Sequence, residues 1–370
     1  MKKFIIDGRT TGLKMAHKIV VGMSGGVDST VAAILLKQQG YDVNGVFMKT
    51  WDEKNFPDCK TKSACYGPEE REIEEIEKIS KILEIPVYFV DARKEFKKRV
   101  LDYFKKEYLS GRTPNPCVLC NRFIKFQFLV DEIQKQGVNF DFFATGHYAR
   151  VEYDKNHNRY ILKKGIDANK DQSYFLFLLT QKQLSQIKFP LGNYTKNEVK
   201  NIAKKHGLKI VEKKESQDFI PGDRFFIFDN GIEPGEIVDK NGHILGRHKG
   251  IIYYTIGQRR GLGISCAKPL YVIEIQAEKN RIVVGEEKEL YRDALIAEDV
   301  NWIGIEKIES PIEARTKIRY RHQEAESTIF PLRNNRARVV FKKPQRAITP
   351  GQVAVFYKDD ILLGGGFIRD

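Results

Sequence analysis

Apolar and polar residues follow two different periods along the first half of the chain. Residues 19–21 form an apolar run typical of a buried strand, and residues 28–39 then place apolar side chains at helical spacing until Gly40. The same succession recurs, and it predicts strands at 42–48, 87–90 and 141–145 and helices at 68–83, 96–104 and from about 117 to 133. Strands that alternate with helices predict a parallel sheet covered by helices on both faces.

Beyond residue 208 the pattern becomes mostly β. Thr195 and Glu198 form a capping-box pattern for one more helix, which we expect to stop at Gly207. Short strands are then predicted at 317–320, 338–341, 352–357 and 361–368, and turns at 350–351 and 364–366. Because 370 residues exceed one ordinary core, we predict three domains. They are a Rossmann-like α/β domain at 1–207, a small β-rich domain at 208–284 and a C-terminal β-barrel at 285–370.

The turn between the first strand and the first helix has the composition of a phosphate-binding loop. Small residues let backbone N–H groups approach an anion, and the helix N-terminus adds the positive end of its dipole. No Gly-Lys-Ser/Thr follows, so this is not a Walker A loop, and it is not the dinucleotide G-x-G-x-x-G. The alternative is a joint whose glycines only permit tight packing. The residues of the predicted loop are Gly22, Met23, Ser24, Gly25, Gly26, Val27, Asp28 and Ser29.

The net charge and the number of cysteines indicate which kind of partner and which cellular compartment to expect. The formal net charge is +14, from 63 Lys and Arg against 49 Asp and Glu, which favours a polyanionic partner such as nucleic acid over a merely soluble basic protein. Five cysteines are too few for a disulfide scaffold of this size and fit a reducing cytoplasm. No apolar run reaches the roughly 20 residues that a membrane span needs. The first residues lack the apolar core of a signal peptide, and Met15 is an alternative start.

A second chemical cluster lies at residues 111–126. Two prolines precede Cys117 and Cys120, and a helix is predicted to begin near these cysteines. A thiol at a helix N-terminus beside Arg122 and Lys125 is expected to have a lowered pKa and to react as the thiolate. The alternative is that Cys120 is a small buried core residue, as most free cysteines are.

Taken in order, the motifs resemble those of one enzyme family. Ser-Gly-Gly-Val-Asp-Ser at 24–29 is similar to the pyrophosphate loop of ATP pyrophosphatases, which cleave ATP between its α and β phosphates. The whole series resembles the tRNA-specific 2-thiouridylases and covers essentially the whole chain. The further matching segments are Phe-Met-Lys at 47–49, Thr-Pro-Asn-Pro-x-x-x-Cys-Asn-Arg-x-Ile-Lys-Phe at 113–126, Ala-Thr-Gly-His-Tyr-Ala-Arg at 144–150, Lys-Asp-Gln-Ser-Tyr at 170–174, Tyr-Thr-Ile-Gly-Gln-Arg-Arg-Gly-Leu-Gly at 254–263, Lys-Ile-Arg-Tyr-Arg at 317–321 and Pro-Gly-Gln at 350–352.

The resemblance implies a sheet of the adenine nucleotide alpha hydrolase type and a set of site residues. O2 of uridine would attack the α-phosphorus of ATP, the loop would bind the departing pyrophosphate, and Asp28 would hold Mg²⁺. Met48 and Gly146 would contact the adenine nucleotide, and Cys120 would be the nucleophile. A target base inside a stacked anticodon loop would have to be everted to reach Cys120. The residues implied to contact tRNA are Asn115, Pro116, Cys117, His147, Lys170, Asp171, Gln172, Arg319, Tyr320 and Gln352. From sequence alone, His147 is equally consistent with a buried core histidine.

The chain departs from the family pattern at its second cysteine. The family carries a persulfide on a cysteine in a segment like Ser-x-Asp-Ile-Cys-Phe, and residues 215–223 of this chain contain no cysteine. Instead Cys117 stands where the commoner pattern has Asp. Cys117 would carry the persulfide, or it would ligate an iron–sulfur cluster of the [4Fe–4S] kind with Cys120 and Cys65 or Cys59, or these four cysteines would bind structural zinc. We favour the cluster, because a single change of mechanism would then explain both the missing cysteine in residues 215–223 and the additional cysteine at position 117.

The leading hypothesis is an ATP-dependent sulfurtransferase that makes 2-thiouridine at wobble position 34 of tRNA. A related enzyme that thiolates another tRNA position or ribosomal RNA is the nearest alternative. A small-molecule synthetase of the argininosuccinate or NAD type fits the basic charge poorly, and a non-enzymatic RNA-binding module has no use for the loop and thiols. The expected partners are the anticodon arm of tRNA and a sulfur donor protein or sulfide, with neither membrane nor DNA. Sequence leaves the donor and the oligomeric state open.

Overall fold

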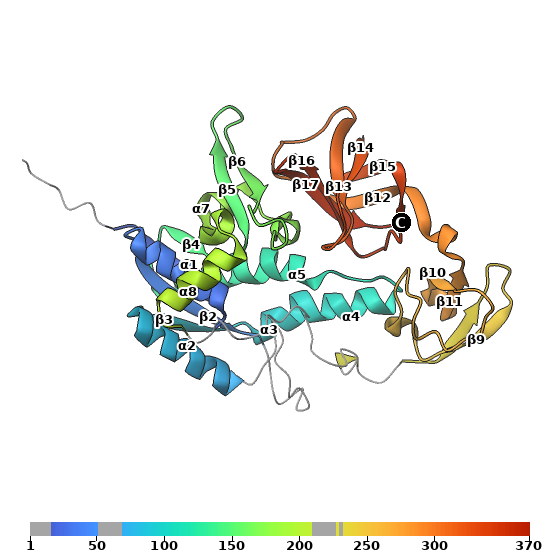
Figure 1. The fold of residues 1–370 in the computed structure, drawn as a ribbon, viewed down its shortest axis with the longest axis horizontal. Helices are drawn as coiled ribbons and strands as arrows, with labels where there is room; N and C mark the ends of the chain where they lie inside the picture. Colours follow the sequence, from blue (N-terminus) through green and yellow to red (C-terminus); the bar gives the residue numbers. More distant parts are fainter. Residues whose placement is uncertain (1–15, 51–68, 209–226, 229–231) are drawn as a thin grey trace, which may run out of the picture.

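The computed structural model describes residues 16–50, 69–208, 227–228 and 232–370. A parallel sheet with helices, a small sheet and a barrel succeed one another along the chain (Figure 1). None of the helices within these ranges is long and apolar enough to cross a membrane. Cys59 and Cys65 lie outside the described residues.

The N-terminal sheet has five parallel strands in the order β3-β2-β1-β4-β7. Its central strand has no exposed face, because Ile19, Val20 and Val21 are fully buried. Ile19 and Val21 pack in one core with α1, α2 and α8, whereas Val20 packs in another with the helices that follow Cys117. The strands are β1 Lys18–Met23, β2 Asp42–Lys49, β3 Val87–Asp91, β4 Phe142–Ala144 and β7 Ile187–Lys188.

Helices cover both faces of this sheet, as the alternating pattern predicts. Three of them flank it on the side of Ile19: α1 Val27–Gln38, α2 Glu69–Leu83 and α8 Lys196–Lys205. The opposite face is covered by one continuous helical stretch, made of α5 Pro116–Leu119, the π-helical turns η2 Cys120–Phe128 and α6 Leu129–Lys135. Shorter elements complete the domain: η3 Ser173–Leu176, α7 Gln181–Gln186 and η4 Pro190–Asn193.

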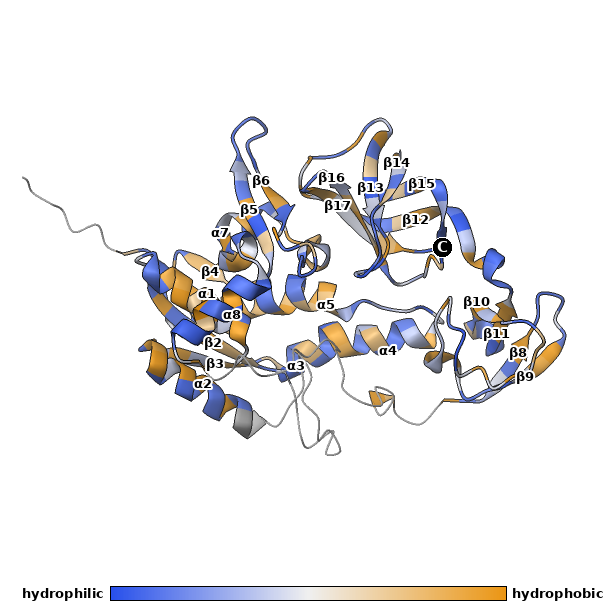
Figure 2. Cartoon of the chain, viewed as in Figure 1, coloured by the Kyte–Doolittle hydropathy of each residue, from blue (hydrophilic) through white to orange (hydrophobic). Residues whose placement is uncertain are grey.

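A long helical stretch links this domain to the small central sheet. It comprises α3 Arg93–Phe96, the π-helical turn η1 Lys97–Leu101 and α4 Asp102–Leu109, and it runs from beneath the parallel sheet toward the central strands (Figure 1). Figure 2 shows hydrophobic and hydrophilic turns side by side along α4, as in an amphipathic helix. Its apolar side, with Phe104 and Tyr108, shares a core with Ile237 and Val272 of the central sheet. That sheet has the order β10-β11-β8-β9, with β8 Gly235–Val238, β9 Ile244–His248, β10 Tyr271–Gln276 and β11 Arg281–Gly285, and the turns η7 Ile251–Tyr253, η8 Ala277–Lys279 and η9 Glu287–Leu290 lie around it.

The C-terminal strands form an antiparallel barrel. Its order is β12-β15-β14-β13-β16-β17, and pairing of β12 with β17 closes it. The strands are β12 Tyr291–Trp302, β13 Ile312–Lys317, β14 Ala325–Leu332, β15 Arg336–Arg346, β16 Val353–Lys358 and β17 Ile361–Ile368. The barrel encloses its own core, with Leu295, Val339 and Phe356 among its buried residues.

One hairpin joins the first domain to the barrel. Strands β5 Ala149–Asp154 and β6 Arg159–Lys164 come from the N-terminal part of the chain, yet β6 pairs antiparallel with β17. Ion pairs reinforce this junction, because Arg150 and Lys163 both contact the carboxylate of Asp360. The division at residues 207 and 284 stays a prediction, and the β6–β17 pairing crosses it.

Two local predictions in the barrel are wrong. Gly364, Gly365 and Gly366 lie inside β17 and not in a turn. A Cβ on Gly364 would lie 2.5 Å from the carbonyl oxygen of Asn301, and one on Gly366 would lie 2.6 Å from that of Glu298, so these glycines permit β12 to approach β17 closely. The strand predicted at 317–320 in fact ends at Lys317, because Arg319 and Tyr320 leave the sheet for other contacts.

Candidate active site

The predicted phosphate-binding loop lies at the carboxyl end of β1, between β1 and α1. There the chain order of neighbouring strands reverses, since β1 pairs with β2 on one side and β4 on the other. Ligands of open α/β sheets bind at such switch points. Gly25 has φ +69°, a conformation that favours glycine, and Gly26 is the N-cap of α1. The first N–H groups of α1 have no intrahelical acceptor and suit an anion.

Two serines tie the ends of the loop together. The backbone N–H of Ser24 donates to Oγ of Ser29 at 3.1 Å, and the two hydroxyl oxygens lie 3.2 Å apart. Oγ of Ser29 in turn donates to the carbonyl oxygen of Gly26 at 3.2 Å. Ser29 is buried, whereas Ser24 is exposed. The loop is therefore held in shape by its own hydroxyl groups, and one of them faces solvent.

Gly146 packs directly against this loop. A Cβ at position 146 would lie 2.7 Å from the carbonyl carbon of Asp28 and 2.8 Å from the backbone nitrogen of Ser29. Only glycine permits this approach of the segment after β4. Met48, at the carboxyl end of β2, is half-buried and packs against both the core behind the sheet and the core around α4. Both residues predicted to contact the nucleotide thus lie at the loop's edge of the sheet.

Asp28 is held by two residues that sequence reasoning did not identify. Nζ of Lys196 lies 2.8 and 2.9 Å from the two carboxylate oxygens of Asp28, and the hydroxyl of Tyr148 donates to one of them at 2.8 Å. Tyr148 belongs to the quoted motif at 144–150, and Lys196 belongs to the quoted capping box. The motif indicates the family and the capping box indicates a helix start, but neither indicates contact with Asp28.

The helix predicted near the cysteines begins at Pro116, but the predicted lowering of the thiol pKa is wrong. Cys120 is 3% exposed and packs in an apolar core with Phe96 and Ile124, and Cys117 is half-buried. Desolvation raises the pKa of the Cys117 thiol and raises that of Cys120 to about 11, although the charge of Lys125 opposes both shifts. The charge that opposes these shifts is that of Lys125 and not of Arg122, whose guanidinium lies over the ring of Phe123.

The segment before Cys117 is held by both β domains. The N–H of Thr113 donates to the carbonyl oxygen of Pro350 at 2.8 Å, and Nε2 of Gln352 donates to the carbonyl oxygen of Thr113 at 2.9 Å. From the central domain, Thr255 accepts a hydrogen bond from the Thr113 hydroxyl at 3.1 Å. Three quoted motifs, far apart in sequence, therefore meet at Thr113.

His147 follows Gly146 in the chain and is buried among aromatic rings. It is 9% exposed, its Nδ1 lies 2.6 Å from the hydroxyl of Thr145, and Phe126 and Phe189 contact its ring. Burial lowers the pKa of His147 well below its ordinary value, and the charge of Lys125 acts in the same direction. Lys125 is thus close enough to affect His147, Cys117 and Cys120 alike. His147 has the environment of a core histidine, and its contact with RNA stays a prediction.

Most other residues predicted to contact tRNA also make internal contacts. Asp171 is buried and accepts hydrogen bonds from Gly165 and Ser173, and its pKa is raised by desolvation. Gln172 exchanges two hydrogen bonds with the backbone of Tyr148. Nearby on the chain, Lys170 is half-buried.

The remaining predicted contacts surround a group of aromatic rings. Asn115 is buried and hydrogen-bonds the hydroxyl of Tyr174. Tyr320 packs on the ring of Phe175, with centroids 4.5 Å apart, and Arg319 donates to the carbonyl oxygen of Arg346 at 3.3 Å. Pro116 is also buried. The predicted tRNA contacts stay untested, and Tyr320 presents an aromatic ring of the kind on which bases stack.

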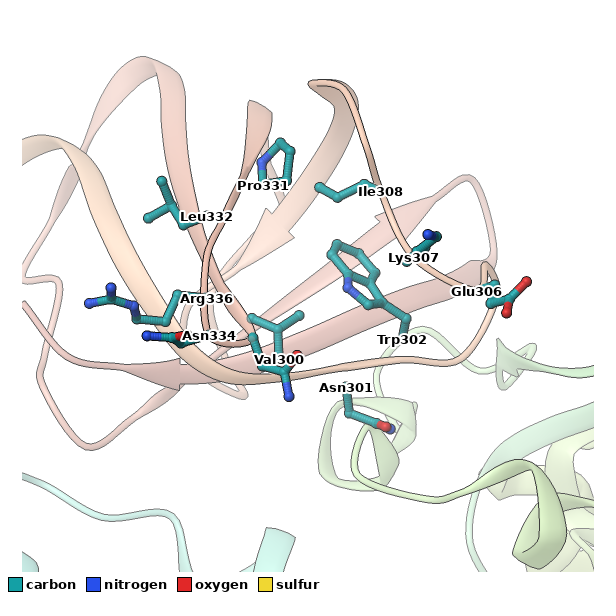
Figure 3. Close-up of a pocket in the computed structure, with 11 residues that line it drawn as sticks. Val300, Asn301, Trp302, Glu306, Lys307, Ile308, Pro331, Leu332, Asn334 and Arg336 are labelled. Atoms are coloured by element: carbon teal, nitrogen blue, oxygen red, sulfur yellow. The ribbon is translucent and has the colours of Figure 1, made fainter.

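The described residues contain no group of three or more His, Cys, Asp or Glu side chains that could hold a metal ion. Of the four cysteines predicted as metal ligands, only Cys117 and Cys120 lie in the described ranges. A separate cavity of about 450 Å³ opens on the barrel, and Trp302, Ile308 and Arg336 are among the residues that line it (Figure 3). The predicted site residues do not line this cavity.

Three family profiles match successive parts of the chain. The one described as "tRNA methyl transferase HUP domain" matches residues 17–221, "tRNA methyl transferase PRC-barrel domain" matches 229–286, and "Aminomethyltransferase beta-barrel domain" matches 292–368. Together they cover the parallel sheet, the central sheet and the barrel in that order.

Curated relatives match over nearly their full length. The chain is 50% identical to the tRNA-specific 2-thiouridylase MnmA of Endomicrobium trichonymphae, over 95% of this chain and 98% of that one. It is 48% identical to tRNA-specific 2-thiouridylase MnmA 1 of Caldanaerobacter subterraneus subsp. tengcongensis, over 96% and 99%. It is 46% identical to the corresponding enzyme of Acetivibrio thermocellus, over 95% and 99%.

The fold defines a HUP-domain enzyme with two appended β domains, and the predicted phosphate-binding loop lies in the HUP domain. The predicted α/β sheet, central β domain and C-terminal barrel are confirmed. Identity near one half extends through all three parts. The chain belongs to the tRNA-specific 2-thiouridylase family.

Proposed function

We propose that this protein is a tRNA-uridine 2-sulfurtransferase that uses ATP to convert wobble uridine-34 to 2-thiouridine. One observation carries the proposal. Gly146 packs against the phosphate-binding loop, and the next residue, His147, lies within the electrostatic reach of Lys125, which also acts on Cys117 and Cys120. The predicted nucleotide loop and the cation that acts on both thiols therefore both lie near one short segment, which supports adenylation followed by sulfur transfer.

In the proposed reaction, O2 of the uracil attacks the α-phosphorus of ATP and pyrophosphate leaves. The N–H groups at the start of α1 and the hydroxyl of Ser24 bind the departing charge, which stabilises the transition state. Mg²⁺ commonly binds to one or two carboxylates and to substrate phosphates, and the single carboxylate of Asp28 fits that role. When bound, Mg²⁺ would neutralise charge on the pyrophosphate.

Sulfur then replaces the adenylated oxygen. Cys117 and Cys120 are three residues apart on a helix, a spacing that places side chains on the same face. We propose Cys117 as the persulfide carrier: its terminal sulfur attacks C2 and AMP leaves. Cys120 then attacks the Cys117 sulfur, which releases the thiocarbonyl and leaves a Cys117–Cys120 disulfide for a cellular reductant.

The cluster and zinc alternatives require more ligands than these two thiols. The further candidates, Cys65 and Cys59, are outside the described residues, so the cluster favoured from the sequence stays a prediction and we assign no step to it or to zinc. Burial keeps both thiols protonated at neutral pH, so a proton must leave when the substrates bind. Lys125 is the cation positioned to stabilise the resulting thiolate.

RNA as substrate is supported by charge and by the relatives. The net charge of +14 suits a polyanion, and the relatives named above are tRNA-specific enzymes. Matching extends through both β domains, which a small-molecule synthetase would not need. We propose a cytoplasmic location and a sulfur donor that supplies a persulfide.

Mass spectrometry of tRNA nucleosides tests this function. Cells that lack the protein should lose 2-thiouridine derivatives at position 34. Expression of the wild-type chain should restore them, and the Cys120→Ala chain should not. Unchanged 2-thiouridine, with loss of another thiolated nucleoside, would favour the alternative RNA position and contradict the proposal.

A further inference from the structure

A buried lysine lies against the phosphate-binding loop from a helix distant in sequence. Lys196 is the first residue of α8, its side chain is 10% exposed, and its ammonium contacts both carboxylate oxygens of Asp28. Helices α1 and α8 pack against each other, and their N-terminal ends meet at this ion pair. The contact therefore joins α8 to the loop itself.

This position is unfavourable for a lysine on structural grounds alone. The N-terminus of a helix carries partial positive charge, which repels a cation, and lysine is rarely buried without a reason. Thr195 and Glu198 already form a complete capping box, so α8 does not need Lys196 in order to begin. The lysine's backbone N–H donates to Asp167 at 2.9 Å, which fixes the residue at the helix start.

We propose that Lys196 is a phosphate-binding residue for ATP, and that Asp28 holds its ammonium when no nucleotide is bound. This inference rests on the proposed function and deepens it. The Asp28 carboxylate has two competing partners, the lysine ammonium and the Mg²⁺ that accompanies ATP. When both enter, Asp28 passes to the metal and Lys196 to an oxygen of the pyrophosphate group.

The exchange places a cation where negative charge develops. Cleavage between the α and β phosphates leaves charge on the bridging oxygen of the departing pyrophosphate, and a fixed ammonium stabilises that charge more in the transition state than in bound ATP. Tyr148 shares the same carboxylate, since its hydroxyl donates to Asp28 at 2.8 Å. Tyr148 therefore keeps Asp28 oriented after Lys196 leaves it.

The competing explanation is that Lys196 only neutralises Asp28. Binding of Mg²⁺–ATP, and separately of inorganic pyrophosphate, to the full chain without tRNA distinguishes the two. Calorimetry on Lys196→Gln should show affinity for both ligands reduced at least tenfold, while affinity for AMP changes less than twofold. Lys200→Gln is the matched control, because Lys200 is exposed on the same helix, and it should bind as the wild type does. Wild-type affinity for pyrophosphate in folded Lys196→Gln would overturn the proposal.

A second comparison applies if Lys196→Gln does not fold. Asp28→Asn and the double variant Asp28→Asn/Lys196→Gln both lack the carboxylate charge, and pyrophosphate binding without Mg²⁺ then measures the lysine alone. Asp28→Asn should bind pyrophosphate at least tenfold more tightly than the double variant, and equal affinities would overturn the proposal. These measurements need no RNA. Pyrophosphate binding through Lys196 in a protein that never thiolates tRNA would contradict the proposed function and leave this inference standing.

Discussion

Gln352 and Thr113 are joined by a hydrogen bond of 2.9 Å, from the side-chain amide of a barrel residue to a carbonyl oxygen four residues before Cys117. Gly351 lies against the same segment, with φ +88° and space for no side chain, since a Cβ would lie 3.0 Å from the backbone of Thr113. The barrel therefore positions the approach to the thiols. Gln352, which the sequence predicts to contact RNA, forms its side-chain hydrogen bond within the protein in this structure.

Gln352→Ala should slow sulfur transfer without weakening ATP binding. The variant loses the side-chain hydrogen bonds to the carbonyl oxygens of Thr113 and Pro114. Each is worth about 0.5–1.5 kcal/mol, which corresponds to about tenfold or more in single-turnover thiolation if the segment loosens. Gln323→Ala, at an exposed barrel position, is the control and should react at the wild-type rate. Equal rates in both variants would show that the Thr113 anchor does not affect the chemistry.

Asp28→Asn should abolish RNA-dependent pyrophosphate release and leave tRNA binding nearly intact. The substitution removes the carboxylate proposed for Mg²⁺, and it leaves the buried ammonium of Lys196 without its charged partner, at a cost of about 1–3 kcal/mol of stability. Ser24→Ala should act in the same direction with less loss of stability, because Ser24 is exposed. Normal pyrophosphate release by either variant, measured with labelled ATP, would contradict the proposed role of the loop in binding pyrophosphate.

Affinity for tRNA should fall steeply as salt rises, because phosphate contacts release counterions. Arg319→Gln should weaken binding and reduce the slope of log K against log salt by about 1, with ATP affinity unchanged. Arg338→Gln, which removes one exposed charge elsewhere on the barrel, controls for net charge. An affinity independent of salt, by filter binding, would instead favour a small-molecule substrate.

Cys117→Ala separates the three models for the thiols, whereas Cys120→Ala should eliminate thiolation under all of them. In the persulfide model the protein is colourless, and Cys117→Ala is inactive because no sulfane sulfur is carried. In the cluster model, protein prepared without oxygen is brown, and the substitution bleaches it. In the zinc model, elemental analysis finds zinc without sulfide, and Cys117→Ala loses stability first. Full activity in Cys117→Ala would place the second sulfur carrier outside this chain.

Stability should decline as pH falls below the ordinary histidine range. Burial lowers the pKa of His322 to about 4, while unfolded histidines titrate near 6.5. Between these values the unfolded chain binds protons that the folded chain does not, so acidification favours unfolding by up to about 2 kcal/mol at pH 5. His322→Gln should therefore lose less stability than the wild type between pH 7.5 and pH 5 in urea unfolding. Identical pH profiles for His322→Gln and wild type would contradict the assignment.

The strand, turn and helix around residues 18–38 were predictable because their signals are local. Residues 19–21 are fully buried, as their apolar run indicates, and the capping box at Thr195 and Glu198 forms as its spacing requires. The Asp28–Lys196 pair was not predictable in this way, since 168 residues separate its partners. Tertiary packing brings them together, and neither residue's neighbours in sequence indicate the other.

The thiol pKa values also show that local sequence signals do not reveal tertiary packing, and here those signals predict the wrong direction of the shift. A helix start and nearby cations are visible in sequence, and they predict a lowered pKa. The apolar core that surrounds Cys120 includes Phe96 and Leu262, which lie far from it in sequence and whose effect only the fold reveals. Desolvation by these residues outweighs the local cation, so the pKa rises. The glycines at 364–366 were misassigned for a similar reason, because the strand that approaches them lies about 60 residues earlier.

The pairing of β6 with β17 has a consequence for the synthesis of this chain. The ribosome synthesises β6 nearly 200 residues before its partner strand β17. At a synthesis rate of 5–20 residues per second, the outer edge of β6 therefore remains unpaired for roughly 10–40 s. An open strand edge is a template for pairing with other chains. Lys163 and Lys164 lie at this edge, where charged side chains discourage such pairing until Asp360 arrives to neutralise Lys163. The lysine that forms an ion pair in the folded protein thus protects the open strand edge of the nascent chain.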